Sequence, residues 1–421
     1  MPKKITLKNG LRIITVPQKN SQTVTVLVLV GTGSKYEKKE INGISHFLEH
    51  LFFKGTKKRP STLAISETLD RVGGIYNAFT GEEYTGYFAK VDAKHLDLAL
   101  DWVSDIFLNS KIDPAEIERE KGVIIEEINM RFDHPITYIQ TLWNKLLYGD
   151  QPAGWDVAGT KERVMKINRS DLLDYMRSQY VAKNTVVCAA GRIKNSQAVK
   201  KIKKYFSEIK TSQFLQKPKV FEEQTRPNFL LHERKTDQAH LCLGVRGYNL
   251  FHPQRYAQEI LGTILGGMMS SRLFINVRER LGIAYYINAS ALADTDTGYL
   301  VAQAGIDNNK IESGISAILK EYKNISQKKV PEKELKKAKD YIKGKTAILL
   351  ESSDAKAFFY AGQELLEKKI LTPEAIFKKI DQVTQNDILK VAREIFQPKK
   401  LNLALIGPFK DKTKFQRLLR L

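Results

Sequence analysis

Two histidines and a glutamate lie close together in the apolar stretch "NGISHFLEHLFFKGT", residues 42–56. His46, Glu49 and His50 are spaced i, i+3 and i+4, which places all three side chains on one face of a helix. Two imidazoles four residues apart can hold one Zn²⁺ at about 2.0–2.1 Å. The carboxylate between them would lie beside the metal and accept a proton from a water whose pKa has fallen to about 7. The pattern predicts a metal centre for hydrolysis.

The competing interpretation of this stretch is a chance arrangement of buried histidines. The chain has seven histidines, and a chance match to H-x-x-E-H is expected in roughly one such chain in a hundred. Imidazoles and a carboxylate inside an apolar helix need partners or a metal. The apolar surroundings therefore favour the metal site.

A catalytic zinc also needs a third protein ligand and an open position. The candidates lie in "EREKGVIIEEINM", residues 118–130. Glu120 and Glu127 are seven residues apart on one helix face, whereas Glu126 is rotated away from that row by about 100°. The register favours Glu127 as the ligand, with Glu120 beside it as a group that orients a ligand or manages protons. A solvated acidic helix face is the alternative.

The composition is that of an ordinary globular protein. Of 421 residues, 42% are hydrophobic and 27% are charged, enough for a sizeable core in two or more domains. No apolar run is long enough for a membrane span, and residues 1–16 lack the apolar segment of a secretory signal. We therefore expect a cytoplasmic protein, or one whose leader has been removed, that binds no membrane.

The formal net charge of +21 raises the possibility of a nucleic-acid binder. The lysines, however, are scattered over the expected surfaces of helices, and no nucleic-acid motif accompanies them. We expect no nucleic-acid partner, and a steep salt dependence of DNA binding would contradict this expectation.

The order of the expected elements divides the chain into two similar halves. Strands and helices alternate through residues 1–212, residues 213–227 are predicted to be a linker, and the plan restarts over residues 228–421. We predict an α+β fold of two homologous domains, each a mostly antiparallel sheet packed with several α-helices. In the second half, "ILGTILGGMM" takes the place of the histidine stretch and has no histidine or glutamate. Only the first domain is expected to hold the metal.

Four stretches resemble blocks of one enzyme family, in the family's order: "GISHFLEHLFFKGTKKRP", "GGIYNAFTGEEYTGYFAKV", "EREKGVIIEEINM" and "GMMSSRLFINVRERLGIAYYINAS". The family is that of the pitrilysin, insulinase and mitochondrial processing peptidase zinc metallopeptidases, and H-x-x-E-H is its inverzincin signature. The resemblance covers nearly the whole chain. In the family, a distal glutamate that follows another glutamate by seven residues completes the zinc ligands. Of Glu126 and Glu127, only Glu127 has such a neighbour, so the resemblance also points to Glu127.

The resemblance implies a peptide-binding segment at Asn77, Ala78, Phe79 and Thr80. This stretch matches the edge strand on which such enzymes pair an extended peptide. A strand edge offers unpaired backbone N–H and C=O groups, so it binds a peptide backbone with little sequence preference.

The resemblance also implies a role for Arg278 and for Tyr285, seven residues later. In the family, this pair comes from the half without zinc and closes over the site. An arginine can orient a peptide carbonyl, and a tyrosine hydroxyl can stabilise an oxyanion. An ordinary surface arginine and a strand tyrosine are the alternative.

We thus predict a zinc metalloendopeptidase with one Zn²⁺ per chain that hydrolyses short or unfolded peptides enclosed in a chamber. Glu49 would be the general base on the zinc-bound water. Family members of this length pair as homodimers, so the resemblance implies a homodimer and a clamshell chamber formed on dimerisation. The alternative is a catalytically silent core or structural subunit of a larger complex. Such relatives tend to lose motif residues, which this chain retains.

Overall fold

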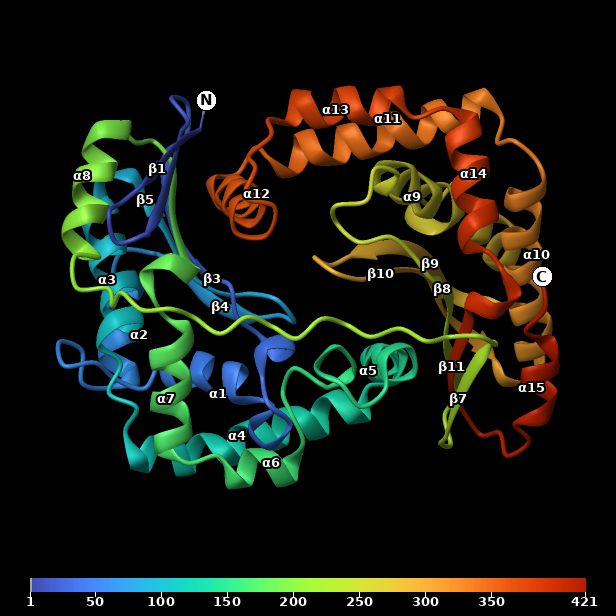
Figure 1. Cartoon of the computed structure of the whole chain (residues 1–421), viewed down its shortest axis with the longest axis horizontal. Coiled ribbons are helices and arrows are strands. Elements are labelled where there is room, and N and C mark those ends of the chain that lie inside the picture. The colour runs from blue at the N-terminus through green and yellow to red at the C-terminus, as the bar shows by residue number, and fades with distance from the viewer. Residues whose placement is uncertain (1) are drawn as a thin grey trace. The chain divides into compact units, whose positions relative to one another are not determined.

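The computed structural model describes residues 2–421, and the chain divides into two compact units (Figure 1). Unit 1 contains the residues up to Asn129, Trp155–Pro218 and Ala347–Leu371; unit 2 contains Met130–Gly154, Lys219–Thr346 and Thr372–Leu421. The predicted domains, 1–212 and 228–421, were each a single stretch of chain. The two units of the structure instead each include a helical segment from beyond the expected boundary.

The sheet of unit 1 has six strands in the order β1-β2-β6-β3-β5-β4. They are β1 (Lys3–Thr6), β2 (Arg12–Pro17), β3 (Thr23–Val30), β4 (Ile75–Thr80), β5 (Thr85–Asp92) and β6 (Thr185–Gly191). The β2 and β6 strands are parallel, and the other neighbours are antiparallel. β3, "TVTVLVLV", is buried along almost its whole length. The continuous apolar run at residues 26–30 reflects a strand covered on both faces.

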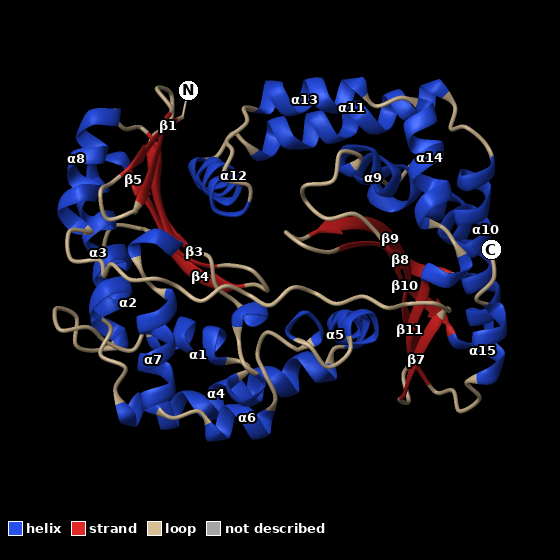
Figure 2. Cartoon of the chain, in the orientation of Figure 1, coloured by secondary structure: helices blue, strands red, loops and turns tan. Residues whose placement is uncertain are grey.

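Helices cover both faces of this sheet (Figure 2). Those that lie wholly or mainly in unit 1 are α1 (Ile44–Leu51), α2 (Thr62–Asp70), α3 (Leu96–Asn109), α4 (Pro114–Asp133), α6 (Lys161–Lys166), α7 (Arg169–Gln179), α8 (Asn195–Tyr205) and α12 (Ser353–Leu366). One face packs against α1, α2, α3, α7 and α8. The other face packs against α12, through Ala357, Tyr360, Ala361 and Leu365. A helix from the end of the chain thus completes the core of the first sheet.

The sheet of unit 2 repeats this topology. Its strands are β7 (Asn228–Glu233), β8 (Gln238–Arg246), β9 (Ala284–Ala293), β10 (Gly298–Asp307) and β11 (Leu401–Gly407), in the order β7-β11-β8-β10-β9. In unit 1, β2-β6-β3-β5-β4 is the same order, and the pair at the start of each of these five-strand orders, β2–β6 and β7–β11, is parallel. The prediction of two homologous α+β domains with mostly antiparallel sheets is confirmed.

Unit 2 also has helices on both faces of its sheet. Those that lie wholly or mainly in this unit are α5 (Pro135–Tyr148), α9 (Arg255–Gly262), two π-helical turns (Thr263–Gly267 and Phe274–Arg280), α10 (Ile311–Gln327), α11 (Glu332–Leu349), α13 (Pro373–Gln382), α14 (Gln385–Ile395) and α15 (Thr413–Leu418). α9, α10 and α14 pack on one face. α5 packs on the other, where Trp143 lies against Gly244 in the space that a side chain would fill. α5 precedes the predicted linker, so unit 2 also contains a helix from the other half of the sequence.

The predicted linker has no helix or strand. Its first part is held within unit 1, where Lys217 forms an ion pair with buried Glu83 (3.2 Å). Its later part is held within unit 2, where the backbone N–H of Val220 donates to Asp296 (3.1 Å). Within residues 2–421, every helix is too short or too polar to span a lipid bilayer.

Candidate active site

The two predicted metal-binding histidines lie on α1, a short helix whose start is fixed by a buried carboxylate. Gly43, the residue before the helix, has φ +100°, and a Cβ there would lie 2.6 Å from the carbonyl oxygen of Ala158; glycine permits both. The side chain of Glu37 accepts hydrogen bonds from the backbone N–H groups of Gly43 (2.7 Å) and Ser45 (2.9 Å). These bonds satisfy N–H groups that the helix leaves unpaired. Burial raises the pKa of Glu37, and the same hydrogen bonds partly oppose that rise.

His46 and His50 on α1 converge with Glu127 on α4. Oε2 of Glu127 lies 3.4 Å from Nε2 of His46 and 3.4 Å from Nε2 of His50. One possible ligand atom from each residue lies within 4.8 Å of the other two, and no second group of this kind occurs among residues 2–421. Glu126 is instead exposed and accepts a hydrogen bond from Asn129. The structure therefore brings together the three residues that the helix register selected.

The donor set of this cluster suits zinc. Two imidazole nitrogens and one carboxylate oxygen match the ligands of catalytic zinc sites, which keep one position open. Hydrogen bonds from His46 and His50 hold the pKa of Glu127 well below its ordinary value. The carboxylate is therefore ionised at neutral pH, as a metal ligand must be.

Glu120 contacts the metal-binding cluster through Nδ1 of His50. Its Oε2 lies 3.0 Å from Nδ1 of His50, and its Oε1 lies 2.7 Å from Nζ of Lys54. Glu120 is only 1% exposed, which rules out the solvated acidic face. Burial opposes its ionisation, but the bonds from His50 and Lys54 hold its pKa below the ordinary value. Burial likewise opposes protonation of His50, yet hydrogen bonds to Glu120 and Glu127 raise its pKa to about 9.

Glu49, the predicted general base, is held by the last residue of β4. The hydroxyl of Thr80 donates to Oε2 of Glu49 at 2.6 Å. Glu49 is half-buried on the same helix as the two histidines. A short bond from a hydroxyl to a carboxylate restricts the rotation of that carboxylate. Glu49 is therefore oriented beside the metal-binding cluster.

β4 is an edge strand, with β5 as its neighbour in the sheet. The N–H of Gly81 donates to the carbonyl of Tyr84 (2.9 Å), which marks these two residues as a hydrogen-bonded pair. Because such pairs alternate with non-bonded ones in an antiparallel ladder, the backbone groups of Ala78 and Thr80 point away from β5. The N–H of Ala78 donates to the side chain of the preceding Asn77 (2.9 Å). The predicted peptide-binding segment thus lies on a sheet edge, partly covered by its own asparagine.

Arg278 and Tyr285 both lie in unit 2, and both are exposed. Arg278 lies on a π-helical turn, with its guanidinium 4.8 Å from the ring centre of Phe274. Tyr285 is 76% exposed on the edge strand β9. The register between β9 and β10 skips Tyr285, which makes it the extra residue of a β-bulge. A bulge redirects a side chain out of the normal alternation, so Tyr285 differs from an ordinary strand tyrosine.

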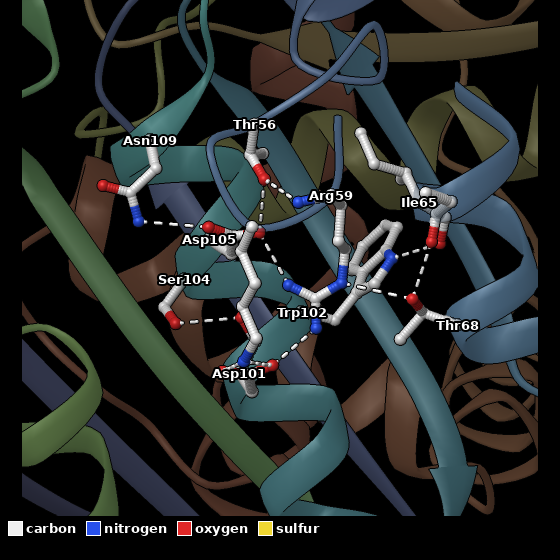
Figure 3. Close-up of polar contacts among 11 residues, drawn as sticks. Thr56, Arg59, Ile65, Thr68, Asp101, Trp102, Ser104, Asp105 and Asn109 are labelled. Atoms are coloured by element: carbon white, nitrogen blue, oxygen red, sulfur yellow. Dashed lines mark hydrogen bonds and ion pairs between the residues drawn. The ribbon is translucent and has the colours of Figure 1, made fainter. Parts of the chain in front are cut away.

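The loop that follows α1 is fastened to α3 by the buried guanidinium of Arg59 (Figure 3). Arg59 binds Asp105 (2.6 Å) and Asp101, and its backbone N–H donates to the hydroxyl of Thr56 (2.8 Å). That hydroxyl in turn donates to Asp105 (2.6 Å). Because a buried charge is tolerated only when it is paired and hydrogen-bonded, this cluster specifies one path for the loop.

Sequence reasoning missed three residues that position the site: Glu37, Lys54 and the side chain of Thr80. A lysine between "FF" and "GT" in an apolar stretch was a visible signal, because a lysine there needs a partner. Thr80 was predicted only as part of a strand edge. No spacing rule connects Glu37 to a helix that starts seven residues later.

Two protein-family models match this chain. A model of the insulinase family, peptidase family M16, matches residues 12–161, and a model of the peptidase M16 inactive domain matches residues 166–342. The chain belongs to peptidase family M16. The match of the second M16 model covers most of the half that lacks the histidine motif.

Relatives of this M16 chain are named zinc proteases. The uncharacterized zinc protease YmxG of Bacillus subtilis is 36% identical over 411 residues, covering 97% of this chain and 98% of the relative. An uncharacterized zinc protease of Streptomyces coelicolor is 33% identical, covering 97% and 90%. At the level of the family, the chain is therefore a zinc protease.

Solved structures share the fold. A protease from Helicobacter pylori superposes with a TM-score of 0.90 at 24% identity, over 97% of this chain and 99% of that chain. A chain of the complex III2 structure from Candida albicans superposes with a TM-score of 0.84 at 19% identity, over 100% of both chains. Both structures share the fold of this chain over nearly its full length.

Proposed function

We propose that this M16 protein is a zinc-dependent endopeptidase that binds one Zn²⁺ per chain and cleaves short or unfolded peptides. His46, His50 and Glu127 would hold the metal. The observation that carries the proposal is the approach of one ionised carboxylate to two imidazole nitrogens, with a second carboxylate, Glu49, on the same helix face. In such a site, the chemistry expected of zinc is acidification of a bound water toward a pKa of about 7 and polarisation of a carbonyl.

Glu49 is the residue that moves the proton. Thr80 holds its Oε2, so Oε1 is the oxygen that accepts a proton from the attacking water and returns it to the leaving nitrogen. A general base that is positioned in this way contributes about 10²–10⁴-fold to the rate.

The peptide would bind as an added strand on β4. The backbone groups of Ala78 and Thr80 that face away from β5 are the ones that such a strand would use. The side chain of Asn77 would have to release the N–H of Ala78 to make room. Because β4 ends at Thr80, which binds Glu49, a peptide paired along β4 would run toward the general base.

Arg278 and Tyr285 would complete the site from the second domain, orienting the peptide carbonyl and stabilising the oxyanion. We propose that the protein acts as a homodimer with a clamshell chamber. A mixture of inactive Glu49→Gln and Arg278→Ala proteins tests where the pair acts. Recovered activity would mean that the pair serves the partner's zinc, and absence of recovery would mean that it serves its own.

The enzyme proposal is distinguished from a silent structural subunit by one experiment. The purified protein is analysed for metal, and a mixed peptide library incubated with it is analysed by mass spectrometry. We expect one zinc per chain and internal cleavage products that disappear with a chelator. A protein that is purified without zinc, and that leaves the library intact even when zinc is then added, would favour the structural role.

A further inference from the structure

We propose that Lys54 is a positioning residue for the metal centre, because it holds Glu120 in place and Glu120 fixes the ring of His50. The inference rests on the proposed zinc function and extends it to a residue that contacts no metal ligand directly. Lys54 follows the end of α1, where its backbone N–H donates to the carbonyl of Leu51 (3.1 Å).

The two oxygens of Glu120 are divided between two donors. Oε1 lies 2.7 Å from the Lys54 ammonium, and Oε2 lies 3.0 Å from Nδ1 of His50. The side chain of Glu120 is 2% exposed, whereas that of Lys54 is 22% exposed. Lys54 therefore links a buried carboxylate to the protein surface and supplies it with a full positive charge.

That charge is what keeps the carboxylate in its buried position. An ionised carboxylate inside a protein is costly unless it is paired as well as hydrogen-bonded. When His50 binds a metal through Nε2, its ring is neutral, and its Nδ1–H alone does not balance the charge of Glu120. Without Lys54, the Glu120 carboxylate is expected to turn away toward water, which would leave Nδ1 of His50 without its acceptor.

The two histidines differ in this support. Nδ1 of His46 is buried and has no hydrogen-bond partner within the described residues. His50 is therefore the histidine of the pair whose Nδ1 is held by a carboxylate, that of Glu120. A metal-binding histidine is oriented by the bond at its other nitrogen, and loss of that support typically weakens metal binding about 10- to 100-fold. The orientation of the site thus depends on the contacts from Lys54 to Glu120 to His50.

The test measures zinc affinity, by competition with a chelator, for full-length wild-type, Lys54→Met and Lys54→Arg proteins. Lys121→Met is the matched control, because Lys121 also pairs with a glutamate of α4, Glu118, at 2.7 Å. We expect Lys54→Met to bind zinc about 10- to 100-fold more weakly. Lys54→Arg should stay within a few-fold of wild type, and Lys121→Met should be unchanged.

The outcomes separate this inference from the proposed function. Wild-type affinity in Lys54→Met would overturn the role of Lys54 while leaving the peptidase proposal intact. A wild-type protein that binds no zinc would overturn the proposed function itself. If Lys54→Met fails to fold, Lys54→Gln replaces it, because glutamine can still donate to Oε1 but has no charge. The loss of zinc affinity in either Lys54 variant should also be non-additive with the loss in Glu120→Gln, because both changes break the same chain of contacts. Additive losses of zinc affinity would contradict the inference.

Discussion

Replacing Thr80 with valine tests how the general base is oriented. Valine keeps the β-branched shape of threonine and removes the hydroxyl that donates to Oε2 of Glu49 at 2.6 Å. A hydrogen bond to a charged group contributes about 1.5–3 kcal/mol. With tenfold in rate for each 1.36 kcal/mol, loss of that orientation should lower kcat/KM about 10- to 150-fold.

The assay is the hydrolysis of an internally quenched peptide by zinc-loaded protein, with the zinc content of every variant measured beside it. Thr80→Val should retain full zinc, because the hydroxyl binds Glu49 rather than a metal ligand. Thr80→Ser should keep most of the activity, since it keeps the hydroxyl.

Thr85→Val is the control for this prediction. Thr85 lies directly across from Thr80 in the β4–β5 ladder, and its hydroxyl donates to the backbone carbonyl of Thr32 (2.9 Å). Its loss should affect stability and leave kcat/KM near the wild-type value. Equal kcat/KM in Thr80→Val, Thr85→Val and the wild type would refute the reasoning.

Three further predictions concern the second domain, the start of α1 and the loop after α1. Tyr285→Phe should lower kcat about 10²- to 10³-fold, as loss of an oxyanion donor does, with zinc content unchanged; undiminished kcat would remove Tyr285 from the mechanism. Glu37→Leu leaves N–H groups at the start of α1 unpaired and should lower the free energy of unfolding by about 1–3 kcal/mol. The loss is measured as a lower midpoint of unfolding in denaturant. Glu40 is exposed, and Glu40→Leu should leave the midpoint unchanged. Burial opposes ionisation of Asp101, but bonds from Lys58 and Arg59 hold its pKa below the ordinary value. The stability that Asp101 contributes is therefore present above about pH 4 and is lost as the pH falls through the pKa of the folded state. Asp101→Asn should accordingly lower Tm at pH 7 more than at pH 3, and an equal loss at both would contradict this sign.

The local part of the site followed from helix geometry. The i, i+3, i+4 spacing of His46, Glu49 and His50 specifies one helix face, and the same geometry separates Glu127 from Glu126. Both arguments need only the rise and turn of one helix. The duplicated sheets were also predictable, because the order of strands and helices repeats along the chain.

The non-local part did not follow from the sequence. The sequence of an amphipathic helix such as α5 or α12 shows an apolar face but not which sheet that face will cover. The sequence therefore did not predict that α5 packs in unit 2 and α12 in unit 1. The contact of Lys54 with Glu120 joins residues far apart in the chain, and no periodicity connects them. The bulge at Tyr285 depends on the register of β9 against β10, which alternation alone does not set.

The central claim is that His46, His50 and Glu127 bind the zinc while Glu49 acts as the general base. The most direct measurement compares zinc content and peptide hydrolysis in Glu49→Gln and Glu127→Gln proteins. Glu49→Gln should keep one zinc per chain and lose about 10²–10⁴-fold in kcat, whereas Glu127→Gln should lose the zinc together with activity. Peptide turnover at the wild-type rate in Glu49→Gln, or full zinc content in Glu127→Gln, would contradict the account.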